Sequence, residues 1–208
     1  MAAEYSNTKI NTFKQCRYKY KLQYIDKIKT ERTKSIEAFL GSRVHETMEK
    51  LYRDKALCKD DSLEELIGYF DTIWDENFDD SITIANKELT VDNYRAMGRK
   101  FITDYYNSHK PFDEMTIIGL ETKDVLTLPN GRTYDVRIDK LGCKGRDYYV
   151  CDYKTDKSMK TKDEADSDRQ LAMYSVWVKQ NYPDAENVHL VWQMLRFDKE
   201  ITSERTDE

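Results

Sequence analysis

The sequence predicts an α/β domain of the α+β kind, in which a helical first part precedes a mixed β-sheet. Three observations support this. Apolar residues recur at helical spacing up to about residue 110, β-branched and alternating segments begin after residue 111, and one more helical stretch precedes the last strand. We therefore expect one domain over residues 1–208, with helices in 1–110 and the sheet core in 111–199.

Four helices are expected in the first part. The first lies in the basic N-terminal segment, where Phe13, Tyr20 and Tyr24 fall near helical spacing and Asn7 or Thr8 is the expected N-cap. The fourth covers 91–106 and ends before the proline of NSHKP. The second and third are defined by apolar stripes, formed respectively by Leu40, Val44, Met48, Leu51 and Tyr52, and by Leu63, Leu66, Ile67, Phe70, Ile73 and Trp74.

A β-meander follows. The expected strands are 116–128, 132–141 and 148–155, separated by the turn signals PNG and CKGRD. A final helix over about 163–181 leads to a last strand at 187–197, and DKEITSERTDE reads as a polar tail. In the second strand the alternation places two sets on opposite faces, Tyr134, Val136 and Ile138 on one and Asp135, Arg137 and Asp139 on the other.

Composition indicates an intracellular, cytoplasmic protein without a membrane segment. Hydrophobic residues make up 39% and charged residues 35% of the chain, and there is neither an 18-residue apolar run nor a signal peptide. The cysteines show no CxxC spacing and read as free thiols in a reducing compartment. They are Cys16, Cys58, Cys143 and Cys151.

The net charge of −5 hides an asymmetry. Residues 9–34 carry nine Lys or Arg and two acids, whereas residues 60–80 carry nine acids and no base. Such a dipolar charge can steer a polyanion to one side of the molecule. The alternative is two solvated helix faces of opposite sign that only improve solubility.

Asp152 and Lys154 form the first element of a candidate site, because residues two apart in a strand share a face. An exposed strand ion pair is the simplest explanation. However, Asp139 lies on the preceding strand, and two carboxylates on neighbouring strands make an oxygen-rich site that suits Mg²⁺ or Mn²⁺. A lysine beside such a site is explained if a water or a phosphate must also be held.

Two helical motifs accompany this pair. His45 follows Gly41 by one turn and lies beside the Val44 and Met48 stripe, so it is either a core histidine or a ligand. Gln170 and Tyr174 share one face of the late helix at i, i+4, a spacing that is common by chance.

Taken together, these motifs resemble the PD-(D/E)XK nuclease superfamily, and within it the RecB/AddB-type branch that includes the CRISPR-associated RecB-like exonucleases. The matching residues occur in the family's order over about residues 5–197, and SNTKINTFKQCRYKYKLQYIDKI is similar to that branch's N-terminal helix. The resemblance implies a restriction-endonuclease-like core with a helical N-terminal elaboration. The matching motifs are Gly41-x3-His45, Ile138-Asp139, Asp152-Tyr153-Lys154 and Gln170-x3-Tyr174.

The resemblance also implies roles for individual residues. Asp139, Asp152 and His45 would bind a catalytic Mg²⁺ or Mn²⁺ together with the backbone carbonyl of Tyr153, and Lys154 would position the attacking water and offset phosphate charge. Gln170 and Tyr174 would contact DNA near the scissile phosphate. Glu121 occupies a strand position whose acid some relatives place near the metal.

Cys16 matches the first of four cysteines that hold an iron–sulfur cluster in several members of this branch, but no cysteine follows Cys151. Three explanations remain: a cluster-free relative, a chain truncated before the other ligands, or a Cys16 that packs in the core. Core packing is the default for a lone buried thiol, and we expect no cluster.

The sequence therefore predicts a metal-dependent deoxyribonuclease, an exonuclease on single-stranded ends, that works in DNA repair, recombination or phage- or CRISPR-type DNA processing with a helicase or similar partner. One alternative is a non-catalytic DNA-binding or structural module of a larger helicase-nuclease. The other is a metal-dependent nucleotide phosphohydrolase. The aromatic and basic residues of 13–29 favour a long polyanion, because tyrosines stack on bases while Lys and Arg meet phosphates. An amphipathic helix with its tyrosines in the core is the competing explanation of that stretch.

Overall fold

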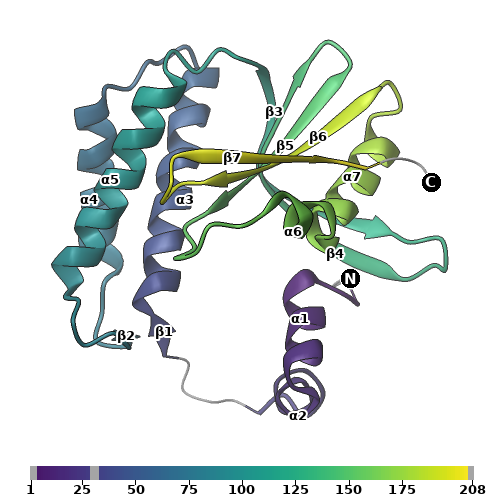
Figure 1. Ribbon diagram of the computed structural model, residues 1–208, viewed down its shortest axis with the longest axis horizontal. Coiled ribbons are helices and arrows are strands. Elements are labelled where there is room, and N and C mark those ends of the chain that lie inside the picture. The colour runs from purple at the N-terminus through teal and green to yellow at the C-terminus, as the bar shows by residue number, and fades with distance from the viewer. Residues whose placement is uncertain (1–3, 29–32, 206–208) are drawn as a thin grey trace.

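The computed structural model describes residues 4–28 and 33–205. In Figure 1 a group of three helices lies beside a twisted sheet, and a smaller N-terminal helical segment hangs below the far side of that sheet. Lys29 and Arg32 of the basic run fall outside the described residues. The elements before the main sheet are α1 (Asn7–Gln15), α2 (Arg17–Tyr20), the π-helix η1 (Lys21–Ile25), β1 (Lys34–Ser35), α3 (Ile36–Ala56), α4 (Leu63–Asn77), β2 (Ile82–Thr83) and α5 (Val91–His109).

The N-terminal segment differs from the single helix expected. Ser6, rather than Asn7 or Thr8, is the N-cap of α1, because its side chain accepts a hydrogen bond from the Lys9 N–H. Cys16 then adopts extended backbone and breaks the helix. Its thiol does not pack in the core as expected but is exposed, and Sγ accepts from the Lys19 N–H to cap α2.

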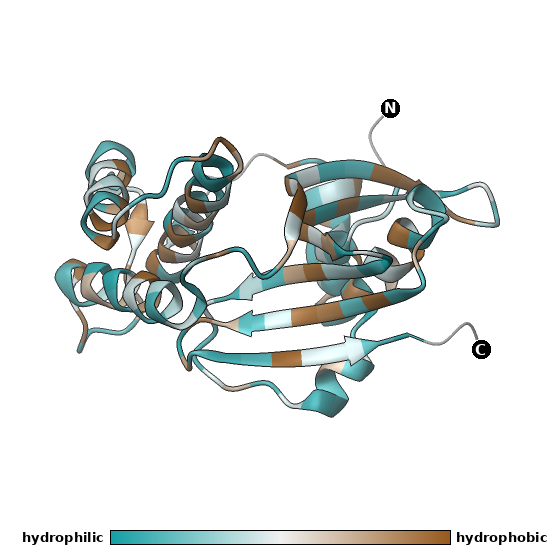
Figure 2. Cartoon of the chain, turned by 90° about the horizontal axis from the view of Figure 1, so that it is seen from above, coloured by the Kyte–Doolittle hydropathy of each residue, from teal (hydrophilic) through white to brown (hydrophobic). Residues whose placement is uncertain are grey.

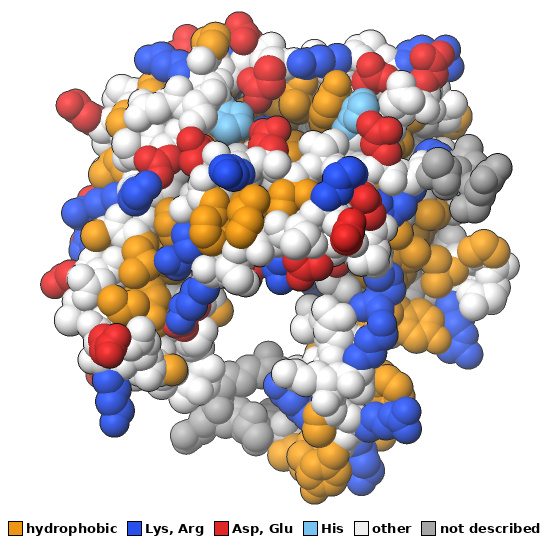
Figure 3. Space-filling view, viewed as in Figure 1, with side chains coloured by type: hydrophobic (Ala, Val, Ile, Leu, Met, Phe, Trp, Pro, Cys, Tyr) orange, Lys and Arg blue, Asp and Glu red, His pale blue; other side chains and the backbone are white. Residues whose placement is uncertain are grey.

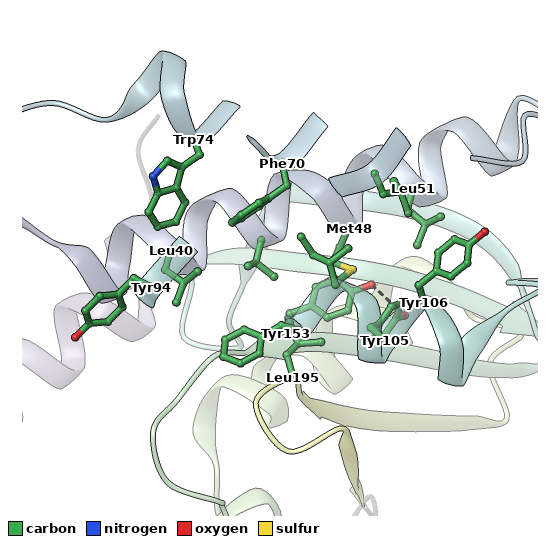
Figure 4. Packing of buried hydrophobic residues seen from close by; sticks show 14 of the residues in the cluster. Leu40, Met48, Leu51, Phe70, Trp74, Tyr94, Tyr105, Tyr106, Tyr153 and Leu195 are labelled. Carbon is green, nitrogen blue, oxygen red and sulfur yellow. Dashed lines mark hydrogen bonds between the residues drawn. The ribbon is translucent and has the colours of Figure 1, made fainter. Parts of the chain in front are cut away.

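The three long helices form the first hydrophobic core. The stripe predicted on α3 is buried throughout, and it packs on α4, α5 and one face of the sheet. Figure 2 shows hydrophobic segments along these helices and in the middle of the strands. Figure 4 shows Met48 of α3 over Tyr153 at the sheet, whereas Leu40 of the same helix lies beside Tyr94 of α5. The Tyr153 side chain therefore faces the core, as the strand alternation predicted.

The main sheet has five strands in the order β3-β4-β5-β6-β7. Only β5 and β6 run parallel; the other pairs are antiparallel. The strand β7 was missed, because its residues read as a polar tail. It pairs with β6 in a hairpin and buries Ile201 and Ser203 on one face. The strands are β3 (Thr116–Thr127), β4 (Thr133–Lys144), β5 (Asp147–Lys154), β6 (Asn187–Met194) and β7 (Lys199–Glu204).

The second core lies between the sheet and α7 (Arg169–Asn181). The helix expected over 163–181 is in fact two, since α6 (Lys162–Asp166) ends at Ser167 and Asp168 caps α7 by accepting from the Leu171 N–H. Tyr174 and Trp177 of α7 pack against Ile138 and Val150 of the sheet. The sheet is therefore covered on both faces. Within the part of the chain that is described, no helix is long and apolar enough to cross a membrane.

Candidate metal centre

The candidate site opens onto a cleft of about 1200 Å³ between α3, β3 and the loop that follows β5. His45 from α3 and Glu121 from β3 both line it. Figure 3 shows that the surface is open on this side of the molecule, between α3 and the N-terminal helices. His45 and Glu121, far apart in the sequence, thus share one solvent-accessible cleft.

Three side chains converge at the inner end of this cleft. His45 Nδ1 lies 3.5 Å from Asp139 Oδ2 and 3.9 Å from Glu121 Oε1. One donor atom from each of the three residues lies within 4.8 Å of the other two. Among the described residues, this is the group whose carboxylate and imidazole atoms are close enough to share one cation.

His45 is held by a second contact. Its Nε2 donates a hydrogen bond of 3.0 Å to the carbonyl of Tyr153, which leaves Nδ1 directed at the two carboxylates. Gly41, one turn earlier, allows α3 to approach the loop after β5, because a Cβ there would lie 3.2 Å from the Thr155 hydroxyl. His45 is therefore not an enclosed core histidine: its side chain keeps 28% of its accessible surface.

Glu121 reaches the site through a distorted stretch of β3. Its φ is 44°, in the left-handed region that non-glycine residues rarely occupy. Leu120 and Thr122 pair with Lys140 and Ile138, whereas Glu121 itself falls where the regular pairing is interrupted. Strain of this kind persists where surrounding structure enforces it, and it is common at functional sites. The sequence marked Glu121 as an acid in a strand but contained no signal for this geometry.

Asp139 lies at a matching irregularity in β4. Ile138 and Leu141 belong to the core against α7, whereas the Lys140 side chain lies on the α3 side, so the alternation shifts by one residue at Asp139. The Asp139 Oδ2 accepts a 2.7 Å hydrogen bond from the Tyr153 N–H. The expected proximity of β4 and β5 at this point is thus present, although strict alternation does not describe it.

Asp152 and Lys154 form an ion pair through Asp152 Oδ2 and Lys154 Nζ. Asp152 is buried, and the Lys154 ammonium is the partner of this oxygen among the described residues. Burial raises the pKa of Asp152 against the opposing effect of Lys154. Burial also lowers the pKa of Lys154, but Asp152 and Asp139 outweigh it and raise the pKa. Lys154 is therefore an ammonium ion that donates hydrogen bonds, not a neutral base, at neutral pH.

The carboxylates also control the protonation of His45. Burial lowers the pKa of His45, but the hydrogen bond and charge of Asp139, with the charges of Asp152 and Glu121, raise it to about 9. Burial and the Asp139 charge raise the pKa of Glu121. Without a cation, the site holds a proton on His45 to balance its clustered negative charge. This clustering of negative charge is compatible with a bound positive ion.

Gln170 and Tyr174 of α7 lie in a second, smaller pocket beside β4 and the start of α1. The Gln170 amide donates a 2.5 Å hydrogen bond to the Tyr174 hydroxyl, which in turn donates to the Arg137 carbonyl of β4. The Tyr174 ring is buried, and both residues line a pocket of about 240 Å³ with Asn7 and Arg137. A ligand in this pocket would reach polar atoms of the two side chains and not the tyrosine ring face.

Lys140 was not singled out from the sequence. It is 3% exposed, and its Nζ donates to the hydroxyls of Tyr52 at 2.9 Å and Tyr105 at 3.1 Å. It lies on the face of the sheet opposite the Asp152 and Lys154 pair. The sequence of the strand contains no signal that predicts the burial of Lys140.

The comparisons with known proteins agree with this geometry. The model of one family, described as the PD-(D/E)XK nuclease superfamily, matches residues 4–207. The chain belongs to the PD-(D/E)XK nuclease superfamily. The mixed five-stranded sheet agrees with the restriction-endonuclease-like fold of this superfamily and confirms the predicted fold class. A search of the curated proteins gave no match.

Membership of the PD-(D/E)XK superfamily implies a nuclease that acts on DNA with divalent cations. The donor set fits such an ion. Carboxylate oxygens from Glu121 and Asp139 with one imidazole nitrogen make a hard site, and the buried carboxylate of Asp152 lies beside them with Lys154 as its partner. The Tyr153 carbonyl has a second lone pair beyond its bond from His45.

Proposed function

We propose that this PD-(D/E)XK protein is a Mg²⁺- or Mn²⁺-dependent exonuclease of the RecB/AddB type that hydrolyses phosphodiester bonds at single-stranded DNA ends. The observation that carries the proposal is the convergence of His45, Glu121 and Asp139 within 4.8 Å, beside the Asp152 and Lys154 pair. Processing of DNA together with a helicase or another recombination or CRISPR partner is the setting that this type of nuclease suggests.

In this proposal His45, Asp139, Asp152 and the Tyr153 carbonyl hold the cation, and Glu121 joins them. When bound, a divalent cation lowers the pKa of its water and offsets charge that develops on the phosphoryl oxygens. The chain's own contribution is positional. Asp139 is kept in place by the Tyr153 N–H, and His45 by the Tyr153 carbonyl, so one peptide unit aligns two ligands.

Lys154 supplies the charge nearest to the reacting phosphate in this proposal. Its ammonium is oriented by Asp152 and by Trp192, whose ring centroid lies 5.9 Å away. Because its pKa is raised, it donates hydrogen bonds to a water or a phosphate oxygen and does not remove a proton. Gln170 and Tyr174 would contact the DNA strand from the adjoining pocket.

The test is an assay with end-labelled single-stranded and duplex DNA in Mn²⁺, Mg²⁺ or EDTA. We expect cleavage from single-stranded ends with either cation, none in EDTA, and none in Asp139→Asn or Asp152→Asn. Full activity in either variant would refute the site. Release of phosphate from nucleotides without DNA cleavage would favour a phosphohydrolase, and DNA binding without either reaction would favour a non-catalytic module.

A further inference from the structure

The acidic character of the cleft raises the question of what holds the substrate strand. Its walls carry five acids against the two lysines Lys123 and Lys157, and Glu37 already pairs with Lys157 at 2.9 Å. Arg43 and Arg53 pair with Glu46 and Glu49, so few positive groups of the cleft are left for phosphates, and a second surface that supplies positive charge would strengthen DNA binding. The acids are Glu37, Glu46, Glu49, Glu121 and Asp156.

That surface is the segment formed by residues 13–28, which we call the arm. It comprises the end of α1, α2, η1 and the residues up to Ile28. Among the described residues, nine large hydrophobic side chains are notably exposed, and four of these lie in the arm. They are Phe13, Tyr18, Ile25 and Ile28, with Tyr18 at 68% exposure. Clustered exposed apolar residues mark a surface that meets a partner. Tyr20 and Tyr24 are only half-buried, so the core position considered for the tyrosines is wrong.

Aromatic rings in the arm support one another. The Phe13 and Tyr20 ring centroids lie 5.3 Å apart, and those of Tyr20 and Tyr24 lie 5.0 Å apart. The Arg17 guanidinium lies 5.4 Å from the Phe13 centroid. These contacts fix the rings in place before any ligand binds. Tyr18 makes none of these ring contacts and leaves its face open to solvent.

The arm also carries positive charge. Its five exposed basic residues face a single acid, Asp26, and only Lys21 forms an ion pair within the described part of the chain. By contrast, four acids of the run at 60–80 form ion pairs among the described residues, for example Asp71, which binds Arg95 and Arg99 at 2.8 Å. The arm is therefore basic on a chain of net charge −5. The five are Lys14, Arg17, Lys19, Lys21 and Lys27.

The residues that precede the arm are anchored on β4 and on the start of α7, beside Gln170. Tyr5 pairs with β4 through hydrogen bonds of 3.0 Å from its N–H to Thr133 and 2.8 Å to its carbonyl from Asp135. The Asn7 amide donates to Gln170 at 3.0 Å, and Arg169 donates to Asn7 and to Asn11. The far end of the arm projects away from the sheet (Figure 1), and orange and blue side chains lie side by side on it (Figure 3).

We infer that the arm is a binding surface for the unpaired DNA strand, which it holds outside the acidic cleft while the strand's end reaches the metal centre. Exposed aromatic rings can stack only on bases that are not paired, and the neighbouring basic groups meet the phosphates. A duplex hides its base faces, and an acidic peptide offers no rings to stack. The expected effect of the arm on DNA cleavage rests on the proposed nuclease function. The expected effect on DNA binding does not.

The binding test uses fluorescence anisotropy with a thymidine oligonucleotide of about 16 nucleotides, a length within the usual site size of single-strand binders. EDTA prevents cleavage. We expect Tyr18→Ala to weaken binding about tenfold, because one base loses its stacking partner, and Tyr18→Trp to retain the affinity. Lys14→Gln with Lys19→Gln should reduce the slope of log affinity against log salt by about 1.4. Leu57→Ala, at another exposed apolar side chain, should bind like the wild type.

The catalytic test compares oligonucleotides of about 4 and about 16 nucleotides with Mn²⁺. We expect Tyr18→Ala to lower the ratio of kcat/KM for the long over the short substrate by about tenfold. If DNA is cleaved but Tyr18→Ala changes neither affinity nor this ratio, the arm inference fails and the nuclease proposal stands. If binding depends on Tyr18 and no DNA is cleaved, the arm inference stands and the nuclease proposal fails. Equal dependence on Tyr18 for duplex DNA, poly-glutamate or anionic vesicles would overturn the inference.

Discussion

Lys154 and Lys140 are two poorly exposed lysines on neighbouring strands, and they occupy opposite kinds of surroundings. Lys154 forms an ion pair with Oδ2 of the buried Asp152, and the Lys154 side chain keeps 24% of its surface. Lys140 is 3% exposed, with two tyrosine hydroxyls as acceptors and the Tyr52 ring 4.1 Å from its Nζ. Its nearest carboxylate oxygen, from Glu114, is 3.9 Å away.

The two lysines differ in whether the charges around them are balanced by neighbouring groups. On the cleft side, Asp139, Glu121 and Asp152 are crowded, and their negative charge is balanced by Lys154, by Lys123 and by a proton on His45. On the opposite face of the sheet from Asp152, Lys140 is enclosed, and the hydroxyls of Tyr52 and Tyr105 accept its hydrogen bonds. We therefore expect changes on the cleft side to alter chemistry more than stability, and changes around Lys140 to do the opposite.

The largest expected effect is on turnover. Lys154→Ala should lower kcat by about 10²–10³, as the loss of one transition-state contact does, because the ammonium that faces the phosphate is gone. Mn²⁺ affinity measured by calorimetry should stay within a few-fold, since Lys154 is not a ligand. Lys100→Ala, at an exposed lysine on α5, is the control. A loss of kcat below tenfold would break the proposed role of Lys154.

The second effect is on stability. Lys140→Ala should reduce the free energy of unfolding by about 3 kcal/mol, because it removes a buried side chain and leaves a cavity. Lys140→Met should recover most of this loss, since an apolar side chain of similar size needs no charge compensation. Urea unfolding in EDTA measures both. If instead Lys140→Met abolished turnover at normal stability, the contrast between the two lysines would be wrong.

The third effect is a pH dependence of the metal-free protein. The pKa of His45 is about 9 in the fold against an ordinary 6.5, so its proton stabilises the fold fully below pH 6.5. This stabilisation is lost as the pH rises through 9. The difference in unfolding free energy between wild type and His45→Gln should shrink by about 2 kcal/mol over this range, after allowance for solvent screening. A constant difference would show that the carboxylates do not hold this proton.

The smallest effect concerns backbone strain. Glu121→Gly should stabilise the metal-free protein by about 1 kcal/mol, because glycine adopts the φ of 44° without steric cost and one crowded carboxylate is removed. The same change should weaken Mn²⁺ binding. Glu121→Gln keeps the strain and removes the charge, so it separates the two causes. If Glu121→Gly instead destabilised the protein, the backbone conformation at residue 121 would not be a source of instability in the metal-free protein.

Much of the fold could be read from patterns that are local. The apolar stripe of α3 and the alternation in β4 report which side of an element is buried, because helix and strand periods are properties of the backbone itself. The same alternation placed Asp152 beside Lys154 and turned Tyr153 into the core, as the structure shows. The superfamily resemblance is confirmed, whereas the RecB/AddB branch and the roles of individual residues stay predictions.

Other features depend on distant contacts and had no local signal. The strand β7 forms because β6 offers an open edge, and its polar composition concealed it. Cys16 is exposed because extended backbone interrupts the N-terminal helix there, which kept this cysteine out of the core.

Which acids lie close enough together to share one cation could be decided only by the tertiary structure. Glu121 comes close to His45 and Asp139 because its own backbone is left-handed and because the alternation of side-chain faces in β4 changes at Asp139. Strand periodicity encodes neither irregularity. Asp152 meanwhile turns its Oδ2 to Lys154. The sequence by itself determined the residue types and the faces from which a metal centre could be built. The packing of three elements against one another selected the set, because distances between separate strands and helices are properties of the whole fold.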